Sequence, residues 1–323
     1  MITLLSAKFL SMLAVVVGLN SPAMASDLEL VNPQAPTTSE TLYKIDESAQ
    51  PVVVGWNATR PKALLVAIHG LGLHKRAFEK FALAMKDDGI STYALDVRGF
   101  GGWSLQKKRI DFDATAEDIN SLVETLRQTH PNKPVFLIGE SMGGAIALEY
   151  AAKHPDTVDG VISSVPSYDR RSKFGTTLFV GTSALLTGGQ HVSLKTALVN
   201  QVFHNKELQQ KWERDPDSRL SLKLTDLLRF TKFMKQSRQS ISKIYHTPVL
   251  IVQGEQDRLI KPEATEKLFR ELPTGDKQMI ELSKNEHLVF EDGQFDDSVI
   301  SQVQGWLLSH ADTRILSASI AKY

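Results

Sequence analysis

Val135-Phe136-Leu137-Ile138-Gly139-Glu140-Ser141-Met142-Gly143 is the segment from which the architecture of this chain can be inferred. Its first four residues are apolar, as in a buried strand, and its last five form the only Gly-x-Ser-x-Gly of the sequence. The small residues that follow have a helical pattern. A strand, a tight turn and a helix in this order push the serine hydroxyl group out of a sheet, where a substrate carbonyl can reach it. We therefore predict that Ser141 is a nucleophile.

Apolar runs and helical patterns alternate on both sides of this segment. Helices are expected near residues 76–87 and 115–129, and a small-residue helix follows the serine. The predicted strands cover residues 64–68, 92–97, 135–138, 158–163, 249–252 and 278–282. Continuous apolar strands that alternate with helices indicate an α/β fold with a mostly parallel central sheet covered by helices on both faces. Ligands of such sheets bind at the carboxyl ends of the strands.

The first 25 residues resemble a secretory signal peptide. Lys8 is their only charged residue, residues 9–19 form a short apolar core, and Ala23-Met24-Ala25 fits the cleavage rule. We expect cleavage after Ala25 and export to the periplasm or outside the cell, although an uncleaved anchor is the alternative. The polar, proline-bearing residues 26–41 are expected to form a flexible N-terminal arm.

The alternation stops between residues 167 and 244, where the sequence has helical apolar patterns and no convincing strand. An insertion after the carboxyl end of a strand lies above the site, so we predict a helical lid here. Its apolar residues line a channel for an acyl chain or, alternatively, pack the lid against the core. Residues 42–166 and 245–310 are then the core, and residues 311–323 are a C-terminal tail.

Two later strands end close to residues that can complete a catalytic triad. A serine hydroxyl group needs a base, and the base needs a carboxylate that orients it. Asp257 follows the strand at 249–252, and His287 follows the last strand. We predict that His287 transfers the proton and that Asp257 fixes the imidazole, with Glu255 as the rival carboxylate. The order of serine, acid and histidine is the one expected for this architecture.

A tetrahedral intermediate also needs two backbone N–H groups to bind its oxyanion. The N–H group of Met142, the first residue of the helix after the nucleophile, is one candidate, and the helix dipole adds to its effect. The second is expected from the glycine-bearing turn His69-Gly70-Leu71-Gly72, in which Leu71 is our choice.

The composition excludes several classes of protein. A formal net charge of zero gives no electrostatic basis for binding nucleic acid. The absence of cysteine excludes disulfides, thiolate metal sites and a cysteine nucleophile. At 323 residues with 42% hydrophobic composition, the chain can bury a substantial core.

Taken together, these motifs resemble the α/β-hydrolases of the monoacylglycerol lipase and lysophospholipase group, which includes serine aminopeptidase-like proteins. The matching segments are His69-Gly70-Leu71-Gly72, residues 96–101, residues 139–144, residues 254–257 and Glu286-His287. The resemblance implies that Ser141, Asp257 and His287 are the triad, that Leu71 and Met142 form the oxyanion hole, and that no cofactor or metal takes part. Phe100 and Leu73 depart from the group's usual residues, so the resemblance indicates the chemistry better than the substrate.

We therefore expect an exported serine hydrolase that cleaves carboxylic esters, with monoacylglycerols or lysolipids as substrates. Acyl transfer or cleavage of thioesters or peptides by the same triad is the alternative, and a non-catalytic lipid-binding protein is a third. Four cations recur every third residue of one lid helix: Arg229, Lys232, Lys235 and Arg238. They form a solvated face or, alternatively, a contact with an anionic membrane surface.

Overall fold

The computed structural model describes residues 28–30, 40–45, 52–166, 168 and 191–320. The predicted signal peptide therefore lies outside the described residues. Within them the chain forms a nine-stranded sheet in the order β1-β2-β3-β5-β4-β6-β7-β10-β11. Its strands are β1 (Leu28–Leu30), β2 (Glu40–Ile45), β3 (Val53–Trp56), β4 (Ala63–Ile68), β5 (Ile90–Leu95), β6 (Val135–Glu140), β7 (Gly160–Ser164), β10 (Val249–Gly254) and β11 (Lys277–Leu282).

The six adjacent strands β5, β4, β6, β7, β10 and β11 pair with one another in parallel, which confirms the predicted mostly parallel sheet. All six predicted strands are present, and β4, β5, β6, β7 and β10 are buried along their whole length. Ile68 is paired with Gly139, and Glu140 with Ser164, so the strands end together at one edge. Residues that follow β4, β6, β10 and β11 therefore lie close to one another.

Three further strands extend the sheet in an antiparallel arrangement. They correct the expectation of a flexible arm over residues 26–41 only where the structure describes it, because Leu28–Leu30 pairs with β2 and Glu40 begins β2. Residues 26, 27 and 31–39 of the expected arm lie outside the described residues. Pairing satisfies the backbone of these segments, and the Glu40 carboxylate binds the Arg76 guanidinium at 2.9 Å. The short β1 and the half-buried β2 lack the continuous apolar runs that identify the parallel strands.

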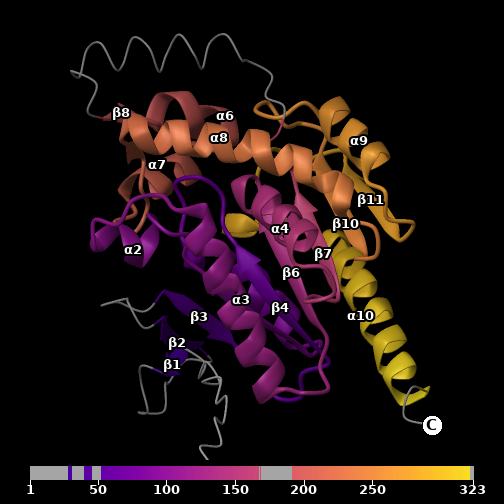
Figure 1. The fold of residues 1–323 in the computed structure, drawn as a ribbon. Helices are drawn as coiled ribbons and strands as arrows, with labels where there is room; N and C mark the ends of the chain where they lie inside the picture. Colours follow the sequence, from indigo (N-terminus) through magenta and orange to yellow (C-terminus); the bar gives the residue numbers. More distant parts are fainter. Residues whose placement is uncertain (1–27, 31–39, 46–51, 167, 169–190, 321–323) are drawn as a thin grey trace, which may run out of the picture.

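Helices cover both faces of the sheet (Figure 1). On one face Val66 of β4 belongs to the same buried cluster as Leu122. On the other, Leu65 is clustered with Phe81 and Trp306. The core helices are η1 (Lys75–Phe78), α1 (Glu79–Lys86), α2 (Gly101–Leu105), α3 (Phe112–Thr129), α4 (Met142–Lys153), α9 (Pro262–Glu271), η4 (Glu291–Gly293) and α10 (Asp297–Ile320).

Helix α10 continues beyond residue 310, the expected end of the core, so most of the expected tail over residues 311–323 is helical. Trp306, which is 5% exposed, anchors the helix in the core through an edge-on contact with Phe136. The described part of the chain has no helix that is both long and apolar enough to cross a membrane.

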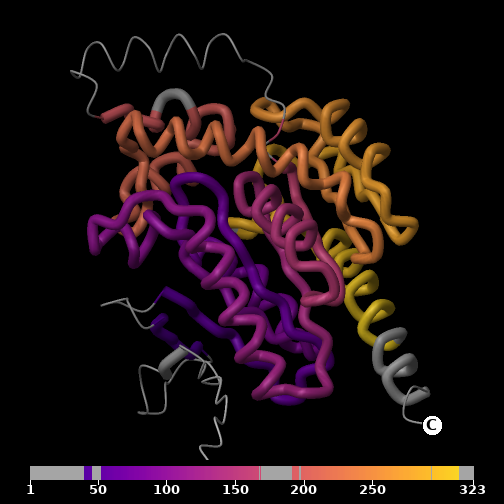
Figure 2. The backbone as a smooth tube through the Cα atoms, viewed as in Figure 1, coloured from indigo at the N-terminus to yellow at the C-terminus, as the bar shows by residue number. Residues whose placement is uncertain are grey.

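The segment 191–244 lies against one end of the core (Figure 2). Its elements are β8 (Val192–Ser193), the π-helix η2 (Lys195–Val199), α6 (Asn200–Val202), α7 (Lys206–Arg214), β9 (Ser221–Leu222), α8 (Leu224–Ser240) and η3 (Ile241–Lys243). The short antiparallel pair of β8 and β9 corrects the expectation of a segment without strands. Residues 169–190 of the predicted lid lie outside the described residues, so the lid stays a prediction.

Candidate active site

Ser141 sits in a strained turn between β6 and α4. Its φ of 56° and ψ of −112° are unusual for a residue with a side chain, a strain that costs about 1–3 kcal/mol and is common at functional sites. The flanking glycines make the turn possible. A Cβ on Gly143 would lie 1.8 Å from the Ile68 carbonyl oxygen, and one on Gly139 would lie 2.1 Å from the Gly143 oxygen. The motif therefore needs glycine at both positions, because the backbone of β4, β6 and α4 meets there.

The structure brings Ser141, His287 and Asp257 together in one hydrogen-bonded chain. His287 Nε2 lies 2.9 Å from Ser141 Oγ, and Nδ1 lies 2.8 Å from Asp257 Oδ2. His287 and Asp257 are each 1% exposed, and Ser141 is 5% exposed. Glu255, the rival acid, is exposed to solvent and does not take the place of Asp257. A histidine held between a hydroxyl group and a carboxylate can accept the hydroxyl proton while its positive charge is stabilised.

Asp257 is held in its ionised form. Its second oxygen, Oδ1, accepts hydrogen bonds from the N–H groups of Leu259 at 2.7 Å and Ile260 at 2.9 Å. Burial alone would raise the pKa of Asp257, but attraction to His287 and the hydrogen bonds to the carboxylate bring this pKa below its usual value. The carboxylate is thus fixed in orientation and negatively charged at neutral pH.

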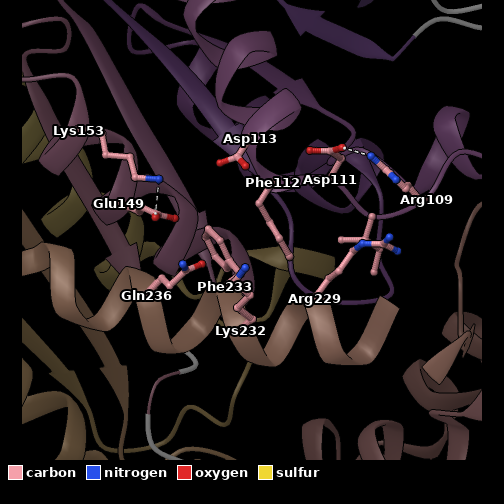
Figure 3. A pocket seen from close by; sticks show the side chains of 11 residues that line it. Arg109, Asp111, Phe112, Asp113, Glu149, Lys153, Arg229, Lys232, Phe233 and Gln236 are labelled. Carbon is pink, nitrogen blue, oxygen red and sulfur yellow. Dashed lines mark hydrogen bonds and ion pairs between the residues drawn. The ribbon is translucent and has the colours of Figure 1, made fainter. Parts of the chain in front are cut away.

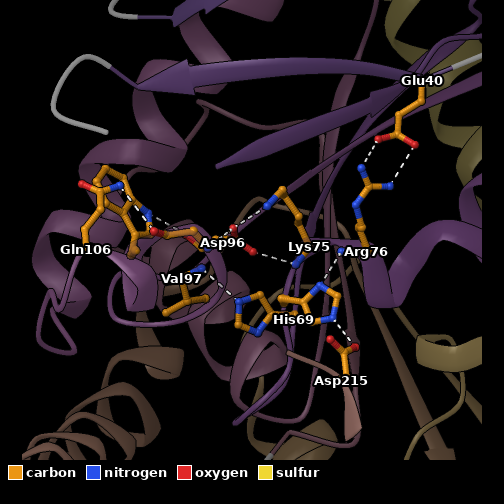
Figure 4. Close-up of polar contacts among 11 residues, drawn as sticks. Glu40, His69, Lys75, Arg76, Asp96, Val97, Gln106 and Asp215 are labelled. Atoms are coloured by element: carbon orange, nitrogen blue, oxygen red, sulfur yellow. Dashed lines mark hydrogen bonds and ion pairs between the residues drawn. The ribbon is translucent and has the colours of Figure 1, made fainter. Parts of the chain in front are cut away.

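His69 holds the turn in which one of the oxyanion donors is predicted (Figure 4). Its Nδ1–H donates to the Gly70 carbonyl oxygen at 2.8 Å, and its Nε2 accepts from the Val97 N–H at 3.0 Å. These bonds require the neutral ring. Burial lowers the pKa of His69 to about 4, which keeps the ring neutral at physiological pH.

Asp96 fixes the same region from the neighbouring strand. It is completely buried, and its carboxylate binds the Lys75 ammonium group at 2.7 Å. It also accepts from the N–H groups of Lys75 and Gly102, both at 2.8 Å. These three contacts connect the segments after β4 and β5, as Figure 4 shows.

One predicted oxyanion donor directly follows Ser141 in the chain, and the turn that carries the other comes close to Ser141. Met142 is the first residue of α4, where N–H groups have no partner within the helix. Gly70, the neighbour of Leu71, is so near the nucleophile that a Cβ on it would lie 3.6 Å from the Ser141 Cβ. The roles of Leu71 and Met142 remain a prediction.

The segment 191–244 contacts the loops on both sides of the site. The Arg219 N–H donates to the Gly72 carbonyl oxygen at 3.0 Å, beside the predicted oxyanion turn. The His204 N–H donates to Glu286 Oε2 at 3.0 Å, immediately before His287. This segment is thus hydrogen-bonded to the turn after β4 and to the loop that carries His287.

The four cations of α8 do not form a single free surface. Arg229 binds Asp226 at 3.3 Å, and Arg238 binds Glu271, whereas Lys232 and Lys235 are exposed. Neutralisation of two of the four cations favours the solvated face, and contact with a membrane remains a prediction.

Three buried ionisable residues beside the site, Glu140, His69 and Glu291, were not predicted from the sequence. Glu140 is treated in the sequence only as the variable residue of the motif, and His69 only as part of a turn, yet both are 0% exposed. For Glu140 the sequence did contain a signal, because a charged residue ends a fully apolar strand. Ionisable groups are seldom buried without partners, so this position predicts a buried carboxylate with polar neighbours. Among the described residues, no cluster of three or more His, Asp or Glu side chains could hold a metal ion.

Comparison with known proteins identifies the family. Residues 59–294 match the family described as serine aminopeptidase, S33. The chain is 24% identical over 253 residues to a monoacylglycerol lipase of Mycolicibacterium smegmatis, covering 78% of this chain and 90% of the relative. It is 26% identical over 263 residues to the human monoglyceride lipase, covering 80% and 86%.

A solved structure supports the same fold. A soluble variant of the Saccharomyces cerevisiae monoglyceride lipase, in complex with a substrate analog, superposes with a TM-score of 0.69 at 20% identity, covering 87% of this chain and 94% of that one. The chain belongs to the serine aminopeptidase S33 family and is a monoacylglycerol lipase-like serine hydrolase with the α/β-hydrolase fold.

Proposed function

We propose that this protein hydrolyses the ester bond of monoacylglycerols through an acyl-enzyme formed on Ser141. The observation that carries the proposal is the hydrogen-bonded chain from Ser141 through His287 to Asp257. The names of the relatives support a monoacyl glycerol ester as substrate. Lysolipids are the related alternative within the same chemistry.

The reaction follows from the positions of these groups. His287 Nε2 takes the Ser141 proton while Oγ forms a bond to the ester carbonyl carbon, and the carbonyl electron pair moves to the oxygen. The Leu71 and Met142 N–H groups are proposed to bind that oxyanion. When the intermediate collapses, the C–O bond to the alcohol breaks and the leaving oxygen takes the proton from His287. His287 then deprotonates a water molecule, whose oxygen forms a bond to the acyl carbon. As this second intermediate collapses, the bond from the acyl carbon to Ser141 Oγ breaks, His287 returns the proton to Oγ, and the fatty acid is released.

Hydrolysis by wild type and Ser141→Ala tests this proposal. We expect wild type to release glycerol from monoacylglycerols and p-nitrophenol from its esters, with long acyl chains preferred over acetate. The variant should keep its circular dichroism spectrum and lose turnover by about 10⁶-fold, as when a triad member is removed. Equal activity in the variant would refute the nucleophile. Faster cleavage of arylamides than of esters would favour the peptidase alternative, and transfer of the acyl group to an added alcohol would favour the acyltransferase.

We also propose export and a lid. Cleavage after Ala25 would leave a mature protein that begins at Ser26, which N-terminal sequencing of the exported protein checks. Retention of Met1 would favour the anchor. The contacts of Arg219 with Gly72 and of His204 with Glu286 support a covering role for the segment 191–244.

A further inference from the structure

Glu140 joins the nucleophile to the segment that follows the catalytic base. It is the last residue of β6, it directly precedes Ser141, and it is completely buried. Its carboxylate accepts hydrogen bonds from the N–H groups of Val289 at 2.7 Å, Phe290 at 3.1 Å and Glu291 at 2.8 Å. The backbone just after His287 is therefore hydrogen-bonded to the side chain of the residue just before Ser141.

Glu291 extends this connection to the predicted oxyanion turn. It too is completely buried, and both of its carboxylate oxygens accept from the Gly70 N–H, at 3.0 and 3.2 Å. Gly70 directly precedes Leu71, the predicted oxyanion donor. Two buried carboxylates in succession thus connect the nucleophile turn, the segment after the base and the oxyanion turn.

The surroundings of Glu140 are suited to a carboxylate and not to its amide isostere. Oε1 faces the Val289 N–H and the Ser164 hydroxyl group, the latter at 2.8 Å, while Oε2 faces the N–H groups of Phe290 and Glu291. Every one of these neighbours can donate. The NH₂ group of a glutamine, in either orientation, would meet donors, and the segment 289–291 would have to move.

Burial of the Glu140 carboxylate costs free energy, because the group is removed from water. Burial raises the pKa of Glu140 above its usual value, and the N–H groups and the hydroxyl group that point at the carboxylate offset only part of this rise. An apolar side chain of similar volume would avoid the cost of removing a charge from water, but it would leave the three N–H groups and the Ser164 hydroxyl group without this acceptor. What the carboxylate adds is a fixed position for three consecutive N–H groups that begin two residues after His287.

We propose that Glu140 and Glu291 are positioning residues for the hydrolysis, which hold the base and the oxyanion turn in register with Ser141. This inference rests on the proposed function for the identity of the reaction. It does not rest on the identity of the substrate. Both glutamates act through the segment 289–291, so their effects on the reaction are expected to be coupled and not additive.

The rate at which a fluorophosphonate labels Ser141 tests the inference. This reagent needs the activated hydroxyl group and the oxyanion donors but no matching acyl chain. We expect Glu140→Gln to slow labelling by about 10²-fold and Glu291→Gln by about tenfold, since complete loss of one oxyanion donor costs about 10²–10³-fold. The double variant should label about as slowly as Glu140→Gln alone. On any ester that is turned over, kcat should fall while KM stays within about twofold.

Glu149→Gln is the matched control. Glu149 is a buried glutamate of α4 that binds Lys153 at 2.8 Å beside the cavity between α3 and α8 (Figure 3). It lies eight residues after Ser141, about 12 Å along the helix. The control should label at the wild-type rate. Wild-type rates in both Glu140→Gln and Glu291→Gln, or equal slowing in the control, would overturn the inference.

Two further results keep this test separate from that of the proposed function. If wild type labels at Ser141 but hydrolyses no monoacylglycerol, the proposed substrate is wrong, while the labelling rates still decide the roles of the glutamates. If the glutamate variants do not fold, Ser164→Ala takes their place, because it removes one donor from Glu140 and leaves the carboxylate intact. Loss of one hydrogen bond should slow labelling about fivefold, and an unchanged rate would overturn the inference.

Discussion

Acidification is expected to destabilise this protein through one buried histidine. His69 binds its proton with a pKa of about 4 in the folded chain and 6.5 in the unfolded chain. Between these two pH values the unfolded chain therefore binds more protons than the folded chain. The contribution of His69 to the free energy of unfolding is fully present above about pH 6.5 and is lost as the pH falls towards 4. The resulting loss in the free energy of unfolding, relative to neutral pH, is about 2 kcal/mol at about pH 5 and reaches about 3 kcal/mol below about pH 4. Protonation would also remove the acceptor of the Val97 N–H and loosen the turn before Leu71.

Urea unfolding followed by tryptophan fluorescence measures this effect. Wild type and His69→Asn are compared at about pH 7.5 and about pH 5. The variant is expected to be less stable at the higher pH, because its hydrogen bonds are altered. Its free energy of unfolding should nevertheless fall by about 2 kcal/mol less than that of wild type between the two pH values. The control is His246→Asn, at an exposed position, which should follow wild type. If the free energy of unfolding falls equally in wild type and in His69→Asn, protonation of His69 is not the cause of the loss of stability.

Two further predictions concern the triad and the turn that carries the nucleophile. Asp257→Asn should leave the fold intact and lower kcat by about 10⁴-fold, because an amide selects the wrong imidazole tautomer; a loss below tenfold in steady-state ester hydrolysis would argue against its role. Gly143→Ala should destabilise the protein by about 3 kcal/mol in thermal or urea unfolding, because its Cβ would overlap the Ile68 carbonyl oxygen at 1.8 Å. Gly275→Ala is the control, since a Cβ there has no atom within 4 Å; similar effects of both changes would show that the overlap has no role.

The parallel sheet was predictable from the sequence because its strands are buried on both faces. Such strands appear as unbroken apolar runs, and the topology then brings the residues after them to one edge. This is why Ser141, Asp257 and His287, far apart in the chain, could be predicted to meet. The antiparallel β1 and β2 escaped notice because half-buried or very short strands lack that pattern. Strand β3 is fully buried, but Gly55 interrupts its apolar run after residues 52–54.

The polar connections around the site were not predictable from single residues. Glu140 contacts residues about 150 positions away, and Gly70 contacts Glu291 across more than 200 positions. Such contacts depend on the order of strands and on the path of two loops, which periodicity does not encode. The lid was predicted as helical from its apolar spacing, yet the same spacing fits helices packed against a core. The preference for long or short acyl chains in the hydrolysis experiments above distinguishes the two interpretations.

The most direct test of the central claim is to identify the residue that carries the acyl group during turnover. Wild-type protein is mixed with a p-nitrophenyl ester, quenched in acid within milliseconds and digested, and the acylated peptide is located by mass spectrometry. We expect an acyl group on Ser141, formed in a burst together with p-nitrophenol, and no acylated peptide in Ser141→Ala. An acyl group on another residue, or undiminished turnover in Ser141→Ala, would contradict the central claim.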